Sequence, residues 1–307
     1  MAQFDTSTKR RHSPPAEIEE QIRLLGPVVD PAGTARIYAE LLSRQPTSGV
    51  DRKLDLPYGD ADRHKLDVYA PSHERQGLPV VLFLHGGGYS RGDKAERANI
   101  GYFFARHGAI ALIANYRLAP GVRWPSGAED VMTALRWAQR TVSTYGGDPG
   151  RMFLMGESAG AAHVALAAFV SRFHGSATLN AAGVILHSGS YNVGLEHRAA
   201  RQFGIPTPDQ RNEAYFGTDT STYDGMSTVQ LIDAPSTRTL IVYAEYDPSP
   251  MQVQAGELFS VLSSRSGVSP ELLRAAGHGH ISQIASFNTE DTSVSGFVLN
   301  FVLSPKI

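Results

Sequence analysis

The sequence predicts an α/β protein with a mostly parallel sheet, and three observations support this fold class. Short runs of β-branched and other apolar residues alternate with longer segments of helical period, the pattern of parallel strands joined by crossover helices. Several strand segments are apolar throughout, as expected when helices cover both faces of a sheet. The chain has 307 residues, close to the length of one large domain of this class with some extra helices.

Seven short apolar runs are predicted to form the main strands. Each is bounded by residues typical of turns and loops. A weaker segment, RKLDLPYG (52–59), precedes them and is expected to begin the sheet in antiparallel fashion. The seven are KLDVYA (65–70), PVVLFLHGG (79–87), AIALIANY (109–116), RMFLMGES (151–158), GVILHSG (183–189), TLIVYAEYD (239–247) and PELLRAAG (270–277).

The segments between the strands are predicted to form helices that cover both faces. Residues 126–145 have an amphipathic pattern, residues 158–173 are nearly all apolar, and residues 250–265 supply another helix. Two regions fall outside the alternation. Residues 1–50 are expected to form N-terminal cap helices, and residues 191–233 a cap insertion, on a main domain of residues 51–307, because no linker or low-complexity block separates them from it.

Composition excludes several classes of function. The formal net charge is −2, with both signs spread along the chain, so neither nucleic acid nor an anionic membrane is expected as a partner. The absence of cysteine excludes disulfides, zinc-thiolate sites and a cysteine nucleophile. The first residues lack the apolar core of a signal peptide, and no later apolar run is long enough to span a bilayer, so a cytoplasmic protein is expected.

A candidate nucleophile lies in GESAG (156–160), where a predicted buried strand meets a helix of small residues. A sharp strand-to-helix turn strains its central residue and leaves no room for bulky neighbours, so glycine is favoured two places to either side. The turn also places Ser158 at a helix N-terminus, which favours the anion formed when a carbonyl is attacked. This context predicts a nucleophilic serine.

A second signal is the glycine run in HGGGY (85–89), at the end of another predicted strand. Three consecutive glycines are costly in conformational entropy, but they allow backbone N–H groups to approach a ligand oxygen closely. Sites in parallel α/β sheets form at this edge. The run is therefore interpreted as part of an oxyanion hole rather than as a merely flexible loop.

A serine nucleophile needs a histidine base and an acid that orients it. TLIVYAEYD offers Glu245 and Asp247, which would point oppositely along a strand. With the order nucleophile, acid, histidine, the base is His278 or His280 in GHGHIS. Glycine flanks His278 on both sides, whereas packing of Ile281 could fix His280, so His280 is predicted to be the base. Structural roles are expected for three other histidines, His85, His163 and His187.

Four motifs, HGGGY, NYRLAP, YGGDPGRMFLMGESAG and EYDP, resemble those of α/β-hydrolases of the hormone-sensitive-lipase group of carboxylesterases, over about residues 66–284. The resemblance implies an eight-stranded, mostly parallel sheet with a helical cap and ester hydrolysis without a cofactor. It also implies Ser158 as the nucleophile, Asp247 as the acid, and an oxyanion hole formed by the amides of Gly87, Gly88 and Ala159. Asn115 and Gly121 stand at two places where related enzymes usually carry acidic residues that are thought to brace the scaffold.

The predicted function is thus that of a serine carboxylesterase acting on short- to medium-chain esters through an acyl-enzyme. No metal is expected, since two histidines without a carboxylate cluster make an incomplete site. Its partner would be a small-molecule ester, and a homodimer remains open. Two alternatives also remain open: an arylformamidase or other amide hydrolase that uses the same triad, and a non-catalytic small-molecule receptor.

Overall fold

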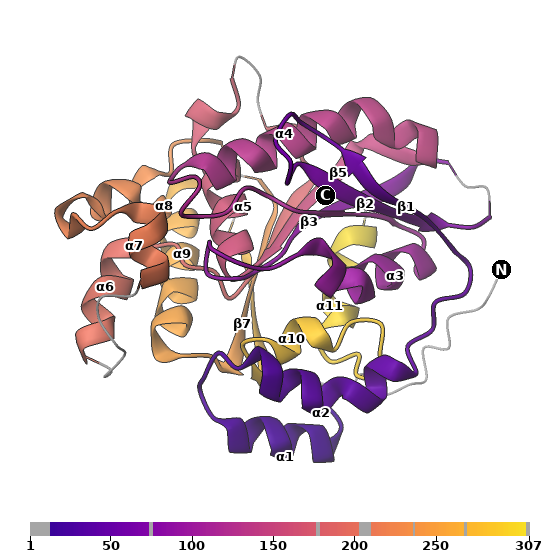
Figure 1. Ribbon diagram of the computed structural model, residues 1–307, viewed down its shortest axis with the longest axis horizontal. Coiled ribbons are helices and arrows are strands. Elements are labelled where there is room, and N and C mark those ends of the chain that lie inside the picture. Colours follow the sequence, from indigo (N-terminus) through magenta and orange to yellow (C-terminus); the bar gives the residue numbers. More distant parts are fainter. Residues whose placement is uncertain are drawn as a thin grey trace.

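The structure is a computed structural model, and it describes residues 13–73, 76–175, 179–202, 210–235, 237–266 and 269–304. Among these residues, eight strands form one sheet in the order β1-β2-β4-β3-β5-β6-β7-β8 (Figure 1). The strands are β1 (Val50–Pro57), β2 (Lys65–Pro71), β3 (Leu78–Leu84), β4 (Ile110–Ala114), β5 (Gly147–Glu157), β6 (Gly183–His187), β7 (Thr239–Tyr246) and β8 (Glu271–Gly279). Each one overlaps a predicted strand, so the predicted fold class is confirmed.

The sheet is parallel from β4 through β3 to β8, and antiparallel at its other end. There, β1 pairs with β2, and β2 pairs with β4, in antiparallel register. An antiparallel start of the sheet was predicted, and the pairing of β1 with β2 has this direction. This first pairing follows from the short connection between β1 and β2, which leaves no room for the crossover helix that a parallel pair needs. The antiparallel pairing of β2 with β4 was not predicted.

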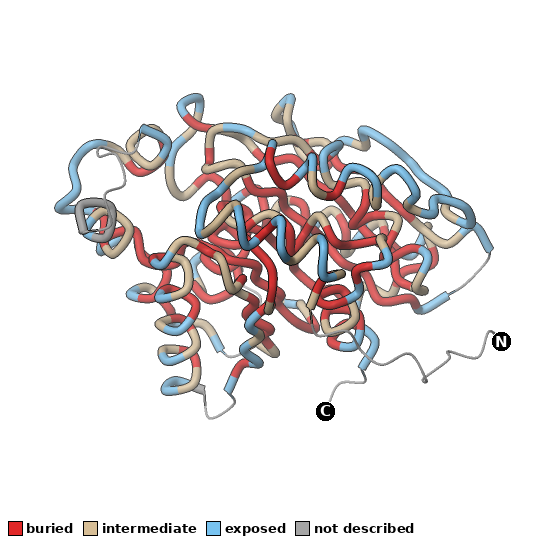
Figure 2. Tube along the Cα trace, turned by 90° about the horizontal axis from the view of Figure 1, so that it is seen from below, coloured by how far each residue is buried: buried red, intermediate tan, exposed pale blue. Residues whose placement is uncertain are grey.

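Helices pack on both faces of the sheet. The helices α4 (Ser126–Thr141), α5 (Ala159–Phe169) and α9 (Ser249–Ser266) contribute to one hydrophobic core, and α3 (Ala98–Arg106) and α11 (Ser295–Leu303) contribute to the core on the other face. Strands β3 and β4 are buried at every position. Figure 2 shows the buried residues gathered in the middle of the molecule, with exposed residues around them. This accounts for the continuously apolar strand segments.

Two further groups of elements lie outside these layers. The first is α1 (Ala16–Leu25) and α2 (Pro31–Ser43), which lie below the main body in Figure 1. The second is the segment with α6 (Val193–Gln202), α7 (Gln210–Phe216) and α8 (Thr228–Leu231). These are the regions predicted to form a cap, although residues 1–12 and 203–209 lie outside the described residues. Short 3₁₀ helices η1 (Lys94–Arg97), η2 (Val142–Tyr145), η3 (Ser171–Phe173), η4 (Thr220–Thr222) and η5 (Asp224–Met226), and α10 (Ser282–Ala285), complete the described elements.

The N-terminal helices are anchored to the C-terminal part of the sheet. Helix α1 contacts β8, and α2 contacts α10. Ile22 of α1 and Tyr38 of α2 are both buried, and full burial of such a side chain contributes roughly 1.5–3 kcal/mol. The Tyr38 hydroxyl donates a hydrogen bond of 2.7 Å to Oδ2 of Asp291. These contacts hold α2 beside the edge of the sheet where β8 ends.

The parallel strands end together at this edge. In the register, Leu84 of β3 pairs with Gly156 of β5, and Glu157 pairs with His187 at the end of β6. The loops that follow β3, β5, β7 and β8 therefore meet at one place, as in other open α/β sheets. None of the described helices is both long enough and apolar enough to cross a bilayer.

Candidate active site

Ser158 occupies a tight turn between β5 and α5. Its backbone is in a strained region, with φ 51° and ψ −121°, and its amide donates to the carbonyl of His187 at 2.8 Å. A Cβ atom on Gly156 would lie 2.5 Å from the backbone of Gly160, and one on Gly160 would lie 2.3 Å from the carbonyl oxygen of Leu84. Only glycine fits at these two positions, which is the reason for the spacing in GESAG. The turn places Ser158 on the wall of a cavity.

Asp247 and His280 meet at the ends of β7 and β8. His280 Nδ1 lies 2.7 Å from Asp247 Oδ1 and donates to it, because an ionised carboxylate can only accept. The other carboxylate oxygen, Oδ2, accepts from the amide of Ala244 at 2.7 Å and from the hydroxyl of Ser188 at 2.5 Å. Both oxygens of Asp247 are therefore held in place, and Asp247 in turn orients the ring of His280. Asp247 is fully buried, and His280 is 4% exposed.

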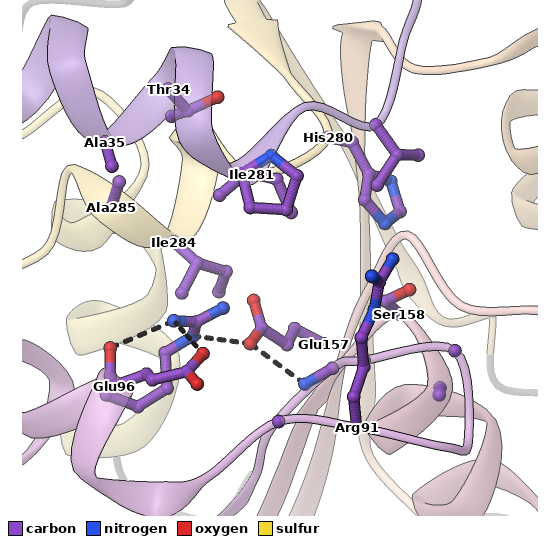
Figure 3. Close-up of a pocket in the computed structure, with 18 of the residues that line it drawn as sticks. Thr34, Ala35, Arg91, Glu96, Glu157, Ser158, His280, Ile281, Ile284 and Ala285 are labelled. Atoms are coloured by element: carbon purple, nitrogen blue, oxygen red, sulfur yellow. Dashed lines mark hydrogen bonds and ion pairs between the residues drawn. The ribbon is translucent and has the colours of Figure 1, made fainter.

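The charges around His280 favour its protonated form. Burial lowers the pKa of the imidazole, but the hydrogen bond and the charge of Asp247 raise it more, with further help from Glu157 and Glu196. The resulting pKa lies above the usual value for histidine. A site that stabilises imidazolium in this way is suited to take a proton from a serine hydroxyl. His280 and Ser158 line the same cavity, where Figure 3 shows both side chains.

Glu245 and His278 each lie two residues before Asp247 and His280, and they are the other candidates for the acid and the base. Glu245 faces β8, where it accepts from the amide of Gly277 at 2.9 Å and pairs with Arg274 at 2.8 Å. His278 is fully buried and does not line the cavity. Its ring nitrogens lie 3.0 Å and 2.7 Å from the hydroxyls of Ser282 and Ser293, and burial lowers its pKa to about 4. The structure thus places both residues in strand and loop packing.

The predicted oxyanion residues, Gly87, Gly88 and Ala159, line the cavity together with Ser158. Gly87 has φ 135° and Gly88 has φ 56°, values that favour glycine. A Cβ atom on Gly87 would lie 1.9 Å from the carbonyl oxygen of Arg91. The tight fold of this loop therefore requires glycine, because a side chain would not fit. The absence of side chains also leaves the loop amides open to a ligand.

Glu157, beside the serine, is a functional candidate that sequence reasoning missed. Its Oε1 accepts the amide of Gly86 at 2.9 Å and Nε of Arg97 at 2.5 Å (Figure 3). Burial raises the pKa of Glu157, but Arg97 and the Gly86 amide lower it more, so the pKa lies below its usual value. This buried carboxylate links the serine turn to the glycine loop. The only signal in the sequence was its place directly before Ser158.

The three other histidines are buried in packing roles, as predicted. Nδ1 of His85 lies 2.6 Å from the carbonyl oxygen of Gly86, and that of His187 lies 3.1 Å from Oε1 of Gln283. The ring of His163 contacts several tyrosine rings. Burial lowers the pKa of His85 and His187 to about 4 and that of His163 to about 3, so all three are neutral near pH 7.

Asn115 braces the scaffold without the negative charge usual at its place. Its Oδ1 accepts from the amide of Lys94 at 2.7 Å, and its Nδ2 donates to Asp93 at 2.8 Å. The asparagine therefore holds η1 close to β4. Gly121 makes no comparable contact: a Cβ atom there would approach only the carbonyl oxygen of Leu118, at 3.4 Å.

The cavity has a volume of about 710 Å³ and two chemically different sides. One side is formed by α2 and α10, with Ala35, Ile281, Ile284 and Ala285 (Figure 3). The other side carries polar groups from the glycine loop, the loop after β6 and the second cap region, namely Tyr89, Arg91, Ser190, Glu196, Arg211 and Asn212. Among the described residues, no cluster of three or more histidines and acids could hold a metal ion.

A strained serine turn, an acid and a histidine after later strands, and a glycine loop, all at the carboxyl edge of a mostly parallel sheet, are the arrangement of an α/β-hydrolase fold. The sequence profile of the BD-FAE family matches residues 66–262, and the chain belongs to this family. The structure resembles esterase B of Lactobacillus rhamnosis, with a TM-score of 0.71 and 20% identity over 88% of this chain and 90% of that one. It also resembles the hyperthermophilic esterase of Pyrobaculum calidifontis, with a TM-score of 0.69 and 21% identity over 94% and 97% of the two chains.

Curated relatives have esterase names as well. The versiconal hemiacetal acetate esterase of Dothistroma septosporum is 28% identical over 197 residues, which are 64% of this chain and 56% of the relative. The carboxylesterase NlhH of Mycobacterium tuberculosis is 37% identical over 126 residues, 39% of this chain and 36% of the relative. The matched segments thus span about half or less of these relatives. The predicted resemblance to α/β-hydrolase esterases is confirmed.

Proposed function

We propose that the protein is a serine carboxylesterase. The observation that supports this best is that His280, joined at 2.7 Å to the buried Asp247, lines the same cavity as Ser158 in its strained turn. The hydroxyl of Ser158 attacks the ester carbonyl while His280 takes its proton. The amides of Gly87, Gly88 and Ala159 stabilise the resulting oxyanion.

The second half of the reaction uses the same groups. His280 returns the proton to the leaving alcohol, and an acyl-enzyme remains on Ser158. His280 then takes a proton from a water molecule as that water attacks the acyl carbon, and it gives the proton to the oxygen of Ser158 when the bond to the acyl group breaks, so that the acid is released and the free enzyme is restored. Asp247 keeps the imidazole in the tautomer with a proton on Nδ1 and stabilises the imidazolium. No step requires a cofactor.

Release of p-nitrophenol from its acetate and butyrate esters tests this proposal. We expect saturable turnover by the wild-type protein and loss of about ten-thousandfold or more in Ser158→Ala, because triad members act as a unit. The variant should fold normally, since alanine keeps the small volume of the turn. A tenth of wild-type turnover in the folded variant would refute Ser158 as the nucleophile. Binding of the ester by the wild-type protein without any turnover would indicate a receptor.

We also propose a preference for short- and medium-chain acyl groups, with α1, α2 and the segment 191–233 acting as a cap. Helices α2 and α10 bound the apolar side of the cavity, which favours an acyl chain of limited length. A series of p-nitrophenyl esters of increasing chain length tests this preference. Maximal activity on long-chain triglyceride emulsions, with interfacial activation, would contradict it.

A further inference from the structure

Arg91 is placed by the same loop that forms the glycine wall of the cavity. Its amide donates to the carbonyl of Gly87 at 3.2 Å, and its own carbonyl oxygen fills the space where a side chain on Gly87 would lie. On the other side, a Cβ atom on Gly92 would lie 2.4 Å from the carbonyl oxygen of Gly86. The backbone of Arg91 is therefore clamped at both ends against the glycines that precede it.

The side chain of Arg91 points into the cavity toward Ser158 and His280 (Figure 3). Although the residue is exposed, its guanidinium has no hydrogen bond or ion pair with any described residue. Two nearby arginines differ from it in this respect. Arg97 is bound to Glu157, and Arg63 donates to the carbonyl oxygens of Tyr116 and Gly92. Arg91 thus presents an unpaired positive charge to whatever enters the cavity.

Two of the acids that line the cavity, Glu157 and Glu196, already accept hydrogen bonds from other groups, and Glu96 is 61% exposed and lies 3.9 Å from Arg97. Glu157 is held by Gly86 and Arg97. The two oxygens of Glu196 accept from Ser190 at 2.6 Å and from Asn212 at 3.1 Å. On the far side of the glycine loop, the side chain of Arg211 lies 3.0 Å from the place of a Cβ atom on Gly88, so a second guanidinium borders the same loop.

We infer that Arg91 binds an anionic group of the substrate, so that the enzyme prefers esters that carry a carboxylate. This inference rests on the proposed esterase function and names its substrate class. Guanidinium matches a carboxylate geometrically, with two parallel N–H···O bonds, and such charge-assisted bonds are among the stronger ones in proteins. The partly enclosed cavity reduces screening by solvent and strengthens the attraction.

Two pairs of esters test the inference, and each pair differs only in a carboxylate. The first is p-nitrophenyl hexanoate and mono-p-nitrophenyl adipate, in which a carboxylate replaces the terminal methyl group of the acyl chain. In the second, p-nitrophenyl butyrate is compared with the same ester bearing a carboxylate beside the nitro group, which puts the charge on the alcohol side. The measured quantity is the ratio of kcat/KM for the anionic ester to that for its neutral partner, at low and high salt.

We expect this ratio in the wild-type enzyme to exceed one for at least one pair, to fall with salt, and to drop about tenfold or more in Arg91→Gln, mainly through KM. Arg91→Lys should recover part of the ratio, because it restores the charge but not the planar fork. The matched control is Arg136→Gln, which removes the same charge from an exposed position on α4, outside the cavity wall. It should keep the wild-type ratio.

The failures of the two proposals are distinguishable. If the neutral esters are hydrolysed but neither anionic ester is preferred, the inference about Arg91 is wrong and the esterase function stands. The inference is equally wrong if Arg91→Gln keeps the wild-type ratio, whether its activity is unchanged or falls equally on both members of a pair. If none of the four esters is turned over by the wild-type protein, both proposals are wrong.

Discussion

Nδ1 of His280 lies 2.7 Å from Oδ1 of Asp247, in a contact that is almost entirely shielded from solvent. Their sequence separation is 33 residues, and they come from the ends of adjacent parallel strands, β7 and β8. Because the contact raises the pKa of His280 against the opposing effect of burial, it determines the pH range in which the imidazole is free to accept a proton.

The first prediction concerns the acid side of the pH profile. His280 must be neutral to act as a base, and its pKa lies above the usual value, so activity is lost as the pH falls through this raised pKa. The midpoint of kcat/KM against pH on a p-nitrophenyl ester is expected above about 6.5, the ordinary pKa of histidine. Asp247→Asn should lower the rate by about ten-thousandfold and move the midpoint to lower pH. A wild-type midpoint below the ordinary value would contradict the assignment.

The second prediction separates the two late histidines. His280→Ala should approach the inactivity of Ser158→Ala, because no other group is oriented to take the proton. His278→Ala should keep far more activity but lose stability, since its removal leaves the buried hydroxyls of Ser282 and Ser293 without an imidazole partner. We expect a loss of about 1–3 kcal/mol in urea unfolding. The reverse order of activities would assign the role of base to His278.

Glu157→Gln provides the third prediction. The substitution keeps the size of the side chain but removes its negative charge. It therefore weakens the hydrogen bonds that Oε1 of Glu157 accepts from Arg97 and from the Gly86 amide. We treat Glu157 as a positioning residue, so kcat on a p-nitrophenyl ester should fall by roughly tenfold or more with KM little changed. The acid midpoint of the pH profile should also shift down, because Glu157 raises the pKa of His280.

Glu96→Gln is the matched control for Glu157→Gln. Glu96 lies 3.9 Å from the same arginine, Arg97, but its side chain is 61% exposed. Exposed ion pairs contribute little, so this variant should retain wild-type kcat and an unchanged midpoint. If the two substitutions lower kcat equally, the loss comes from removing any negative charge near Arg97. The positioning role of Glu157 would then be rejected.

The strands and the serine turn could be predicted because their signals are local. Buried parallel strands are continuous apolar runs, and the glycines at 156 and 160 are needed by the backbone of the turn itself. The direction of β2 had no such signal, since its pairing with β4 depends on a long-range register. The bond between Tyr38 and Asp291 joins residues 253 positions apart, and no local pattern announces it.

The polar network around the site was harder to predict for a related reason. His278 and His280 share nearly the same sequence surroundings, and the burial of His278 depends on Ser293, which comes from a loop before α11. Glu157 and Arg97 are 60 residues apart. Arg91 follows the glycine run closely, but its direction into the cavity depends on how the loop closes on Gly87. Chemistry set by tertiary contacts cannot be read from spacing alone.

The last prediction tests the apolar side of the cavity through α2. Ala35 lies in the cavity wall near Ala285 (Figure 3), so Ala35→Phe should fill part of the space available to the acyl chain. A phenyl ring there would take up space that the longer acyl chain needs, so kcat/KM on p-nitrophenyl hexanoate should fall about tenfold relative to the acetate, which corresponds to roughly 1.4 kcal/mol of transition-state binding. Glu40→Phe, at an exposed position of the same helix outside the cavity wall, is the control for added bulk. If both variants keep the wild-type ratio of hexanoate to acetate activity, α2 does not limit the acyl chain.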